Sequence, residues 1–195
     1  MSNLTRQDLW SLESYSEKRN EFRRKVLAHK KNRRVELGEH CRLYFEDRLT
    51  IQYQVQEMLR IEKIFEAAGI QEELDAYNPL IPDGSNLKAT FMIEYDDPEQ
   101  RQRELGKLIG IERQITLQVD SFEPIQPYAD EDLERENEHK TSAVHFLRFE
   151  LPEPVKSAIL KGSDIKIGVK HAHYQVEANA VRPVVRDTLA KDLTP

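Results

Sequence analysis

Residues 143–176, AVHFLRFELPEPVKSAILKGSDIKIGVKHAHYQV, decide the fold expected for this chain. Apolar and polar residues alternate over 143–151 and again over 164–176, which is the pattern of strands with one face toward a core. Pro152 and Pro154 between them indicate the start of a short helix, because proline is tolerated in a first helical turn. We therefore expect an α+β protein with a mainly antiparallel or mixed sheet in its second half.

Outward from this stretch, the same patterns predict the remaining elements. We expect a hairpin over 34–37 and 41–45, strands over 89–95 and 113–119, and helices over 97–110 and 182–193. The length of 195 residues fits one domain, so 1–195 is taken as a single α+β domain. No apolar run of about 18 residues and no signal peptide are present, which predicts a soluble cytoplasmic protein without membrane contact.

A long helix is expected to begin after Asp47, continue through RLTIQYQVQEMLRIEKIFEAA and end at Gly69. Its apolar stripe, which includes Ile61 and Phe65, predicts a central core helix that covers the sheet. Glu62 falls within this stripe, and a buried carboxylate needs a cation, a metal or a proton. A salt bridge to Arg60, Arg48 or the first helix is favoured over a functional acid.

Basic residues are concentrated near the N-terminus. Residues 18–34 carry a local charge of +8, which leaves −14 on the rest of a chain whose net charge is −6. The spacing of Tyr15, Phe22 and Val26 predicts an amphipathic basic helix within the segment 1–34. This helix either binds an acidic protein partner or is a solvated face, and the acidic remainder of the chain makes nucleic acid a weaker alternative. The residues expected to contact a partner are Arg23, Arg24, Lys30, Lys31, Arg33 and Arg34.

The opposite charge dominates residues 120–140, where eight acidic residues and two prolines precede position 139. This composition predicts a solvated acidic loop or mobile flap. Cysteine is restricted to Cys41, which alternation places on the apolar face of its strand. A single cysteine excludes an iron–sulfur cluster of the chain's own on ordinary thiolate ligation.

Three histidines lie on the apolar faces of the two deciding strands. If these strands pair antiparallel with Leu151 opposite Ile165, His145 faces His171, and His173 follows on the same side. Glu177 continues that side, and Glu62 is a second candidate carboxylate. Such ligands suit a single Fe, Zn or Mn ion in a metal-binding protein or metalloenzyme. The alternative is that these are core histidines with hydrogen-bond partners.

Two stretches, FEDRLTIQYQVQEMLRIEKIF (45–65) and ELDAYNPLIPDGSNLKATFMIEYDD (73–97), resemble the bacterial family known as domain of unknown function 3501. Members of that family are often encoded beside rubrerythrin-like diiron proteins and a cysteine-rich iron–sulfur oxidoreductase. The resemblance implies an accessory subunit of a cytoplasmic redox or oxidative-stress system that docks on such a partner. Among the polar residues of the matching stretches, the candidates for a functional role are Gln54, Glu57, Arg60, Glu62, Tyr77 and Asn78, for which a structural role is the alternative.

Overall fold

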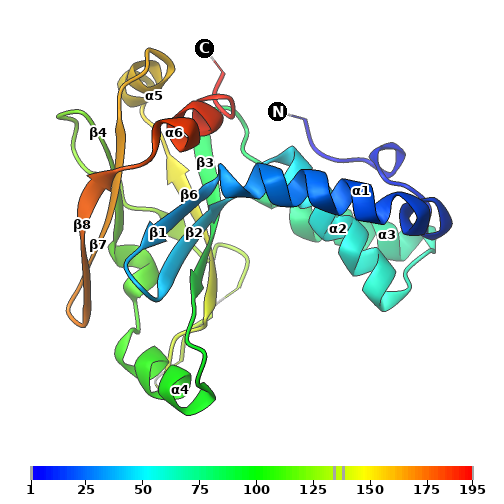
Figure 1. Ribbon diagram of the computed structural model, residues 1–195, viewed down its shortest axis with the longest axis horizontal. Coiled ribbons are helices and arrows are strands. Elements are labelled where there is room, and N and C mark those ends of the chain that lie inside the picture. Colours follow the sequence, from blue (N-terminus) through cyan, green and yellow to red (C-terminus); the bar gives the residue numbers. More distant parts are fainter. Residues whose placement is uncertain (1, 134, 138, 195) are drawn as a thin grey trace.

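The computed structural model describes residues 2–133, 135–137 and 139–194, which form a β body and a helical arm (Figure 1). The body contains two antiparallel sheets, and the arm projects from one side of it. The expected α+β class is confirmed. None of the helices among these residues has the length and apolar character that crossing a membrane requires.

The larger sheet, sheet A, has the strand order β1-β2-β3-β6-β5. Its strands are β1 (Arg34–Leu37), β2 (Cys41–Phe45), β3 (Asn86–Ile93), β6 (Val144–Glu150) and β5 (Tyr128–Ala129). The expected hairpin is confirmed as β1 and β2, and Gly38 in its turn has a φ of 72° that favours glycine. Phe91 of β3 pairs with His145 of β6. Alternate residues of each strand face the core, and the others form an outer face.

In the smaller sheet, sheet B, the expectation that residues 164–176 form one strand is wrong. They form the hairpin of β7 (Ile165–His171) and β8 (Tyr174–Ala180) instead of one strand, and β4 (Ile115–Val119) pairs with the other edge of β7. His171 pairs with Tyr174 across a two-residue turn. Alternation alone does not reveal this turn, because it contains no glycine, asparagine or proline.

The main core lies between the inner faces of the two sheets and includes Leu43, Phe91, Phe149, Ile167 and Leu189. The helices α5 (Glu153–Leu160) and α6 (Pro183–Ala190) close one end of the body, and α4 (Pro98–Lys107) lies at the other end (Figure 1). Cys41 is buried in this core, and burial raises the pKa of its thiol to about 12. It is therefore a small core side chain, as its place on the strand predicted.

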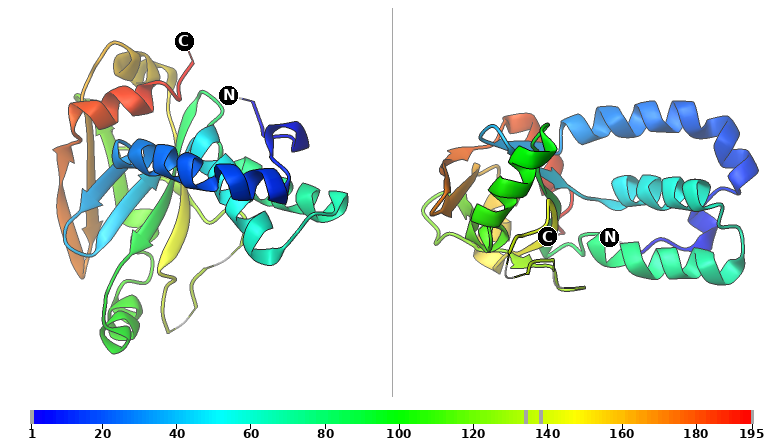
Figure 2. Two further views of the ribbon diagram at one scale, coloured as in Figure 1. Left: turned by 45° about the vertical axis from the view of Figure 1, so that its right-hand side comes forward. Right: turned by 90° about the horizontal axis from the view of Figure 1, so that it is seen from below.

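The arm consists of α1 (Leu12–Lys31), α2 (Arg48–Glu62) and α3 (Ala67–Tyr77), with the short helices η1 (Arg6–Asp8) and η2 (Asn78–Leu80) at its margins. Figure 2 shows α2 between α1 and α3, and α2 contacts both. The arm has apolar clusters of its own, one around Val55, Leu59 and Leu74. A second cluster joins Tyr15, Phe22 and Val26, so the expected apolar stripe of α1 is confirmed.

The long helix differs from its prediction in position and length. Asp47 caps its N-terminus through Thr50 as expected, but α2 packs within the arm instead of across the sheet. It ends at Glu62, followed by Lys63 in the left-handed conformation, and Gly69 lies inside α3. Beyond this break the predicted stripe loses its partner, so Ile61 and Phe65 are 60% and 73% exposed.

The acidic loop is tied to both sheets over its described residues. Ile125 forms an isolated bridge with Leu117 of β4, and β5 pairs with β6. Arg135 lies 2.5 Å from Asp132, and Arg148 of β6 binds Glu131 at 2.7 Å. Intramolecular arginines therefore neutralise part of the acidic charge, which composition alone could not show.

We expect Gly168→Ala to lower the free energy of unfolding by about 1–3 kcal/mol. A β-carbon at this position would lie 2.8 Å from the backbone N and Cα of Ala178 on the paired strand, where β7 has a register shift. The backbone of β8 cannot move away without breaking its pairing. Urea unfolding followed by circular dichroism measures the change.

Gly69→Ala is the matched control, because its added β-carbon would meet only the end of the Ile64 side chain. That side chain can rotate, and alanine favours a helix by about 0.5–1 kcal/mol over glycine. We expect this variant to be as stable as the parent protein or more so. Equal losses in both variants would contradict the close approach at Gly168.

Candidate functional site

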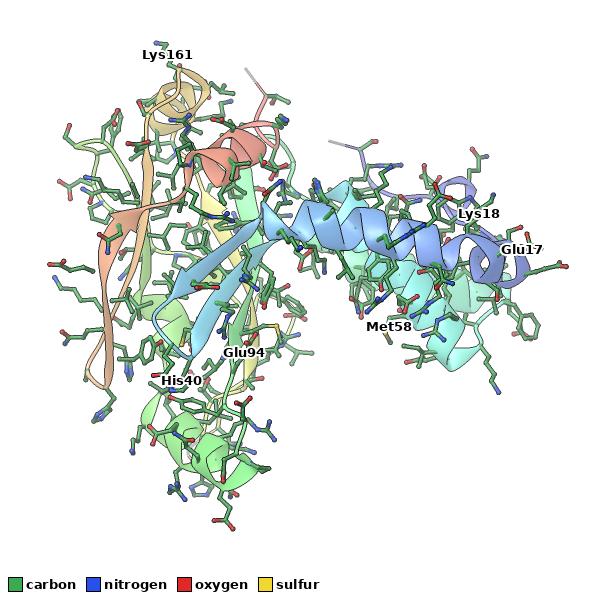
Figure 3. The ribbon with its side chains drawn as sticks, in the orientation of Figure 1. Glu17, Lys18, His40, Met58, Glu94 and Lys161 are labelled. Carbon is green, nitrogen blue, oxygen red and sulfur yellow. The ribbon has the colours of Figure 1, made fainter. Side chains whose placement is uncertain are left out.

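A cleft separates the helical arm from the outer face of sheet A. It consists of an inner pocket of about 360 Å³ and an outer pocket of about 740 Å³. Tyr77, Leu80 and Phe146 line both, so the two pockets are continuous. Figure 3 shows Met58, which lines the outer pocket, on the lower side of the arm in this view. The cleft exists because α2 and α3 pack against each other and not across the sheet.

The inner pocket combines polar and apolar walls. Glu46, which lies between β2 and the cap of α2, is only 7% exposed. Its carboxylate accepts hydrogen bonds from Thr50 and, at 2.8 Å, from Thr90. The other polar side chains that line this pocket are Lys30, Tyr44, Gln54 and Tyr77. Two of the residues that the sequence singled out, Gln54 and Tyr77, thus face one pocket.

The outer pocket is lined by basic side chains, most of which have acidic partners. Arg148 binds Glu131 and Glu150, and its guanidinium lies 4.4 Å from the centre of the Tyr128 ring. Lys88 donates to the carbonyl of Pro79, and burial lowers the pKa of its ammonium. Ion pairs within the chain therefore account for much of the charge in this pocket.

Arg33 lies at the junction of the arm and the body. Its prediction as a partner contact is wrong. It is 1% exposed, donates to the carbonyls of Phe45 and Glu46 at 2.9 and 3.0 Å, and forms a close ion pair with Asp192. Its guanidinium also lies 3.4 Å from Asp47. A side chain this buried cannot contact a partner. The sequence did not distinguish Arg33 from the other basic residues of the segment.

The two carboxylates beside Arg33 respond differently to burial. Burial raises the pKa of Asp192 to about 6 in spite of the nearby guanidinium. Burial also acts to raise the pKa of Asp47, but the charge of Arg33 and hydrogen bonds from Thr50 and His29 hold it below its usual value. His29 lies 2.5 Å from Asp47. The junction is therefore a buried network of charges.

The other predicted contact residues remain accessible. Arg23, Arg24 and Lys31 are exposed and make no ion pair with the residues that the structure describes, and neither does the half-buried Lys30. Arg34 is exposed but pairs with Glu36 at 2.8 Å. The basic face of α1, defined here as Lys18, Arg23, Arg24, Lys25, Lys30 and Lys31, is thus without acidic partners over the described part of the chain.

Among the family-motif residues, Glu57 and Asn78 have structural contacts. Glu57 binds Arg19 through both oxygens at 2.8 Å, and this interaction, with hydrogen bonds from Tyr15 and Arg60, lowers its pKa to about 2. Asn78 hydrogen-bonds both the backbone N–H and the carbonyl of Leu4, which fixes the N-terminal segment to the arm. The salt bridge expected for Glu62 thus forms at Glu57.

Glu62 itself is exposed, so the expected core-facing carboxylate is not there. It is the last residue of α2, and the helix ends before the predicted stripe is complete. Glu177 on β8 and His173 in the β7–β8 turn are exposed too. These three residues therefore do not point into the core, whereas helical spacing predicted that orientation for Glu62 and strand alternation predicted it for His173 and Glu177.

The strand pairing assumed for the histidines is wrong. His145 is on β6 in sheet A, where it pairs with Phe91, and His171 is on β7 in sheet B. The described residues contain no group of three or more His, Cys, Asp and Glu side chains that could hold a metal ion. Metal binding by His145, His171, His173, Glu177 and Glu62 stays a prediction from sequence without the pairing that motivated it.

Both buried histidines have hydrogen-bond partners within the protein. The Nδ1 of His145 lies 2.5 Å from Asp130, and its Nε2 lies 3.0 Å from the hydroxyl of Thr141. His171 lies 3.2 Å from the carbonyl of Ile109. The structural alternative for these two histidines therefore has direct support in their contacts.

The buried Glu112 and the half-buried Glu136 share Arg113 as a partner, which sequence reasoning missed. Glu112, in the short helix η3 (Ile111–Gln114), is 1% exposed, and one oxygen of each carboxylate has no partner among the described residues. Arg113 lies 3.4 Å from Glu112 and 3.2 Å from Glu136. Burial, aided by the charge of Glu136, raises the pKa of Glu112. No local pattern signalled this, because the two residues are 24 positions apart.

The fold and the cleft define an α+β protein with a helical arm beside an open sheet face. The family model described as "protein of unknown function (DUF3501)" matches residues 3–193, and the chain belongs to that family. It is similar to a crystal structure described as a novel protein of unknown function from Burkholderia pseudomallei K96243. The two chains are 52% identical, the match covers 99% of this chain and 100% of that one, and the TM-score is 0.95. No curated protein matches the chain.

We expect Arg33→Met to lower the free energy of unfolding by about 3–5 kcal/mol, because it leaves Asp192 and Asp47 buried without their guanidinium. The neighbouring variant Arg34→Met is the control. It removes only an exposed pair and is expected to change stability by less than about 0.5 kcal/mol. Chemical denaturation of both variants measures the difference, and similar values would contradict the role of Arg33.

We expect Glu112→Gln to stabilise the protein more at pH 7 than at pH 4. The folded-state pKa of Glu112 is raised, so its proton is lost more easily from the unfolded state, and the stability of the parent protein falls as pH rises above about 4.5. Each unit of pKa difference contributes about 1.4 kcal/mol. Unfolding free energies of both proteins across this range test the prediction, and a difference independent of pH would contradict it.

Proposed function

We propose that this protein is a non-enzymatic accessory subunit that binds an acidic surface of a protein partner through the basic face of α1. The observation that carries the proposal is the position of six cations on an exposed helix without intramolecular acidic partners in the described part of the chain. Figure 3 shows one of them, Lys18, on the arm far from the body. Complementary charge accelerates association and selects partners.

Ion pairing elsewhere in the chain supports the same proposal. Arg19, Arg33 and Arg34, the other basic residues of this segment, each bind a carboxylate of the protein. Their charge serves the fold, whereas the charge of the basic face does not. One side of α1 packs on α2, and Arg23, Arg24, Lys25 and Lys31 are exposed on the helix; Figure 2 shows α1 on the far side of α2 from α3. Protein recognition is therefore favoured over a merely solvated face.

The partner class that we propose is the cysteine-rich iron–sulfur oxidoreductase, or the rubrerythrin-like protein, implied by the family resemblance. This chain has one buried cysteine and so offers no thiolate set for an iron–sulfur cluster. Its part in a redox or oxidative-stress system would be to bind the protein that carries the cofactor. A cytoplasmic location belongs to the same proposal.

The test is a binding titration of the purified full chain against these two proteins at low and high salt. We expect the double variant Arg23→Glu/Arg24→Glu to weaken binding about 10-fold or more, because both side chains lie on the basic face. Higher salt should also weaken binding of the parent protein, because it screens the charges.

The matched control is Lys161→Glu/Lys170→Glu, which changes net charge equally but at exposed positions on the body. Lys161 lies on the body beside α5, whereas the basic face is on the arm (Figure 3). This control should bind like the parent protein. Binding that is unaffected by salt and by reversal of Arg23 and Arg24 would overturn the proposal. The proposal would also be overturned if the chain bound duplex DNA in a salt-dependent way and had no affinity for either protein.

A further inference from the structure

The inner pocket has features that docking through α1 does not explain, although Lys30 belongs both to the pocket and to the basic face. Its volume of about 360 Å³ falls at the lower end of the range of about 300–1,000 Å³ typical of small-molecule sites. It lies between the N-terminal end of α2 and the outer face of sheet A. Elements far apart in sequence therefore converge on one pocket.

Glu46 is the first of these features. This carboxylate is more than nine-tenths buried, yet no lysine, arginine or histidine of the described chain lies within ion-pair distance of it. The hydroxyls of Thr50 and Thr90 bind it, and the N-terminal end of α2 favours its negative charge. A carboxylate has about four acceptor positions, so further donors can bind it from the pocket.

A cation in the lining of the pocket is the second feature. Lys30, near the C-terminal end of α1, lines the same pocket but forms no ion pair with a described residue. The side chains of Gln54 and Tyr77 also line the pocket and make no hydrogen bond within the described chain. The pocket thus presents a carboxylate that two threonines already bind, together with a cation and two polar side chains that have no partner among the described residues.

The remaining wall is apolar. Ile51, Leu80, Val144 and Phe146 contribute side chains from α2, the segment after α3, and β6. A ligand with an apolar body would bury it here and gain the hydrophobic contribution of that area. The polar groups would then fix its orientation.

From this arrangement we infer that the inner pocket binds a small zwitterion with an apolar side chain, of the class of the apolar α-amino acids. Its ammonium donates to Glu46, its carboxylate binds Lys30 and Gln54, and its side chain contacts the apolar wall. A simple cation would leave Lys30 unpaired, and a simple anion would meet Glu46 with like charge. A zwitterion pairs with both Glu46 and Lys30 and adds no net charge.

The experiment is calorimetric titration of the full chain with L-leucine and L-phenylalanine. Two analogues test the charged ends separately: L-phenylalaninamide lacks the carboxylate, and N-acetyl-L-phenylalanine lacks the ammonium. We expect a saturable affinity for at least one of the two amino acids, with both analogues binding about 10-fold more weakly or worse.

Variants then assign each end to its residue. Glu46→Gln should weaken the amino acid and its amide, because both carry the ammonium. Lys30→Met should remove the preference for the amino acid over the amide, since only the amino acid has a carboxylate. The matched control is Lys31→Met, which removes an exposed cation one position away from the pocket and should change nothing.

Val144→Trp keeps the inference testable if Glu46→Gln fails to fold. Val144 is half-buried on the outer face of sheet A, so the indole ring of the new tryptophan enters the pocket without altering any charge. It should abolish binding while circular dichroism stays unchanged. The inference is overturned if neither amino acid binds at millimolar concentration, if the amide binds as well as phenylalanine, or if Lys31→Met acts like Lys30→Met. The outcome is independent of partner docking, which Arg23 and Arg24 test.

Discussion

The buried ion pair of Arg33 is the interaction on which the rest of the structure depends. It lies where the chain leaves α1 for β1 and where it passes from β2 into α2, so two of the three connections between arm and body meet at one guanidinium. The same group binds Asp192 near the C-terminus and adjoins the capping residue Asp47. Buried carboxylates that face an arginine restrict how the elements can be arranged, because any separation leaves charges unpaired in the interior.

The cleft and the basic face follow from this attachment. Since the arm is fixed at its base and packs on its own apolar clusters, it does not cover the outer face of sheet A. One side of α1 stays in contact with solvent, and the space below α2 becomes a pocket with charges on its walls. The two surfaces meet near Lys30, while Arg23 and Arg24 lie further along the helix away from the body.

Local patterns were sufficient for most individual elements. The hairpin of β1 and β2, the helix cap at Asp47 and the strand β6 were predicted because turns, caps and alternation are short-range features. The same reasoning failed at 164–176, where a turn without glycine or proline divides the segment into β7 and β8. It also extended α2 beyond Glu62, because the apolar spacing continues across a break that only the left-handed Lys63 makes visible.

The sequence by itself determined the α+β class and the concentration of positive charge on α1. These depend on composition and on periods of two or about four residues. Only the tertiary structure decided which charged residues are buried and which are accessible. Arg33 and Arg34 are neighbours in sequence, but one is enclosed by carboxylates and the other is solvated. Likewise, Glu46, Lys30 and Phe146 share a pocket only because distant segments pack together, and partners at such separations leave no local pattern.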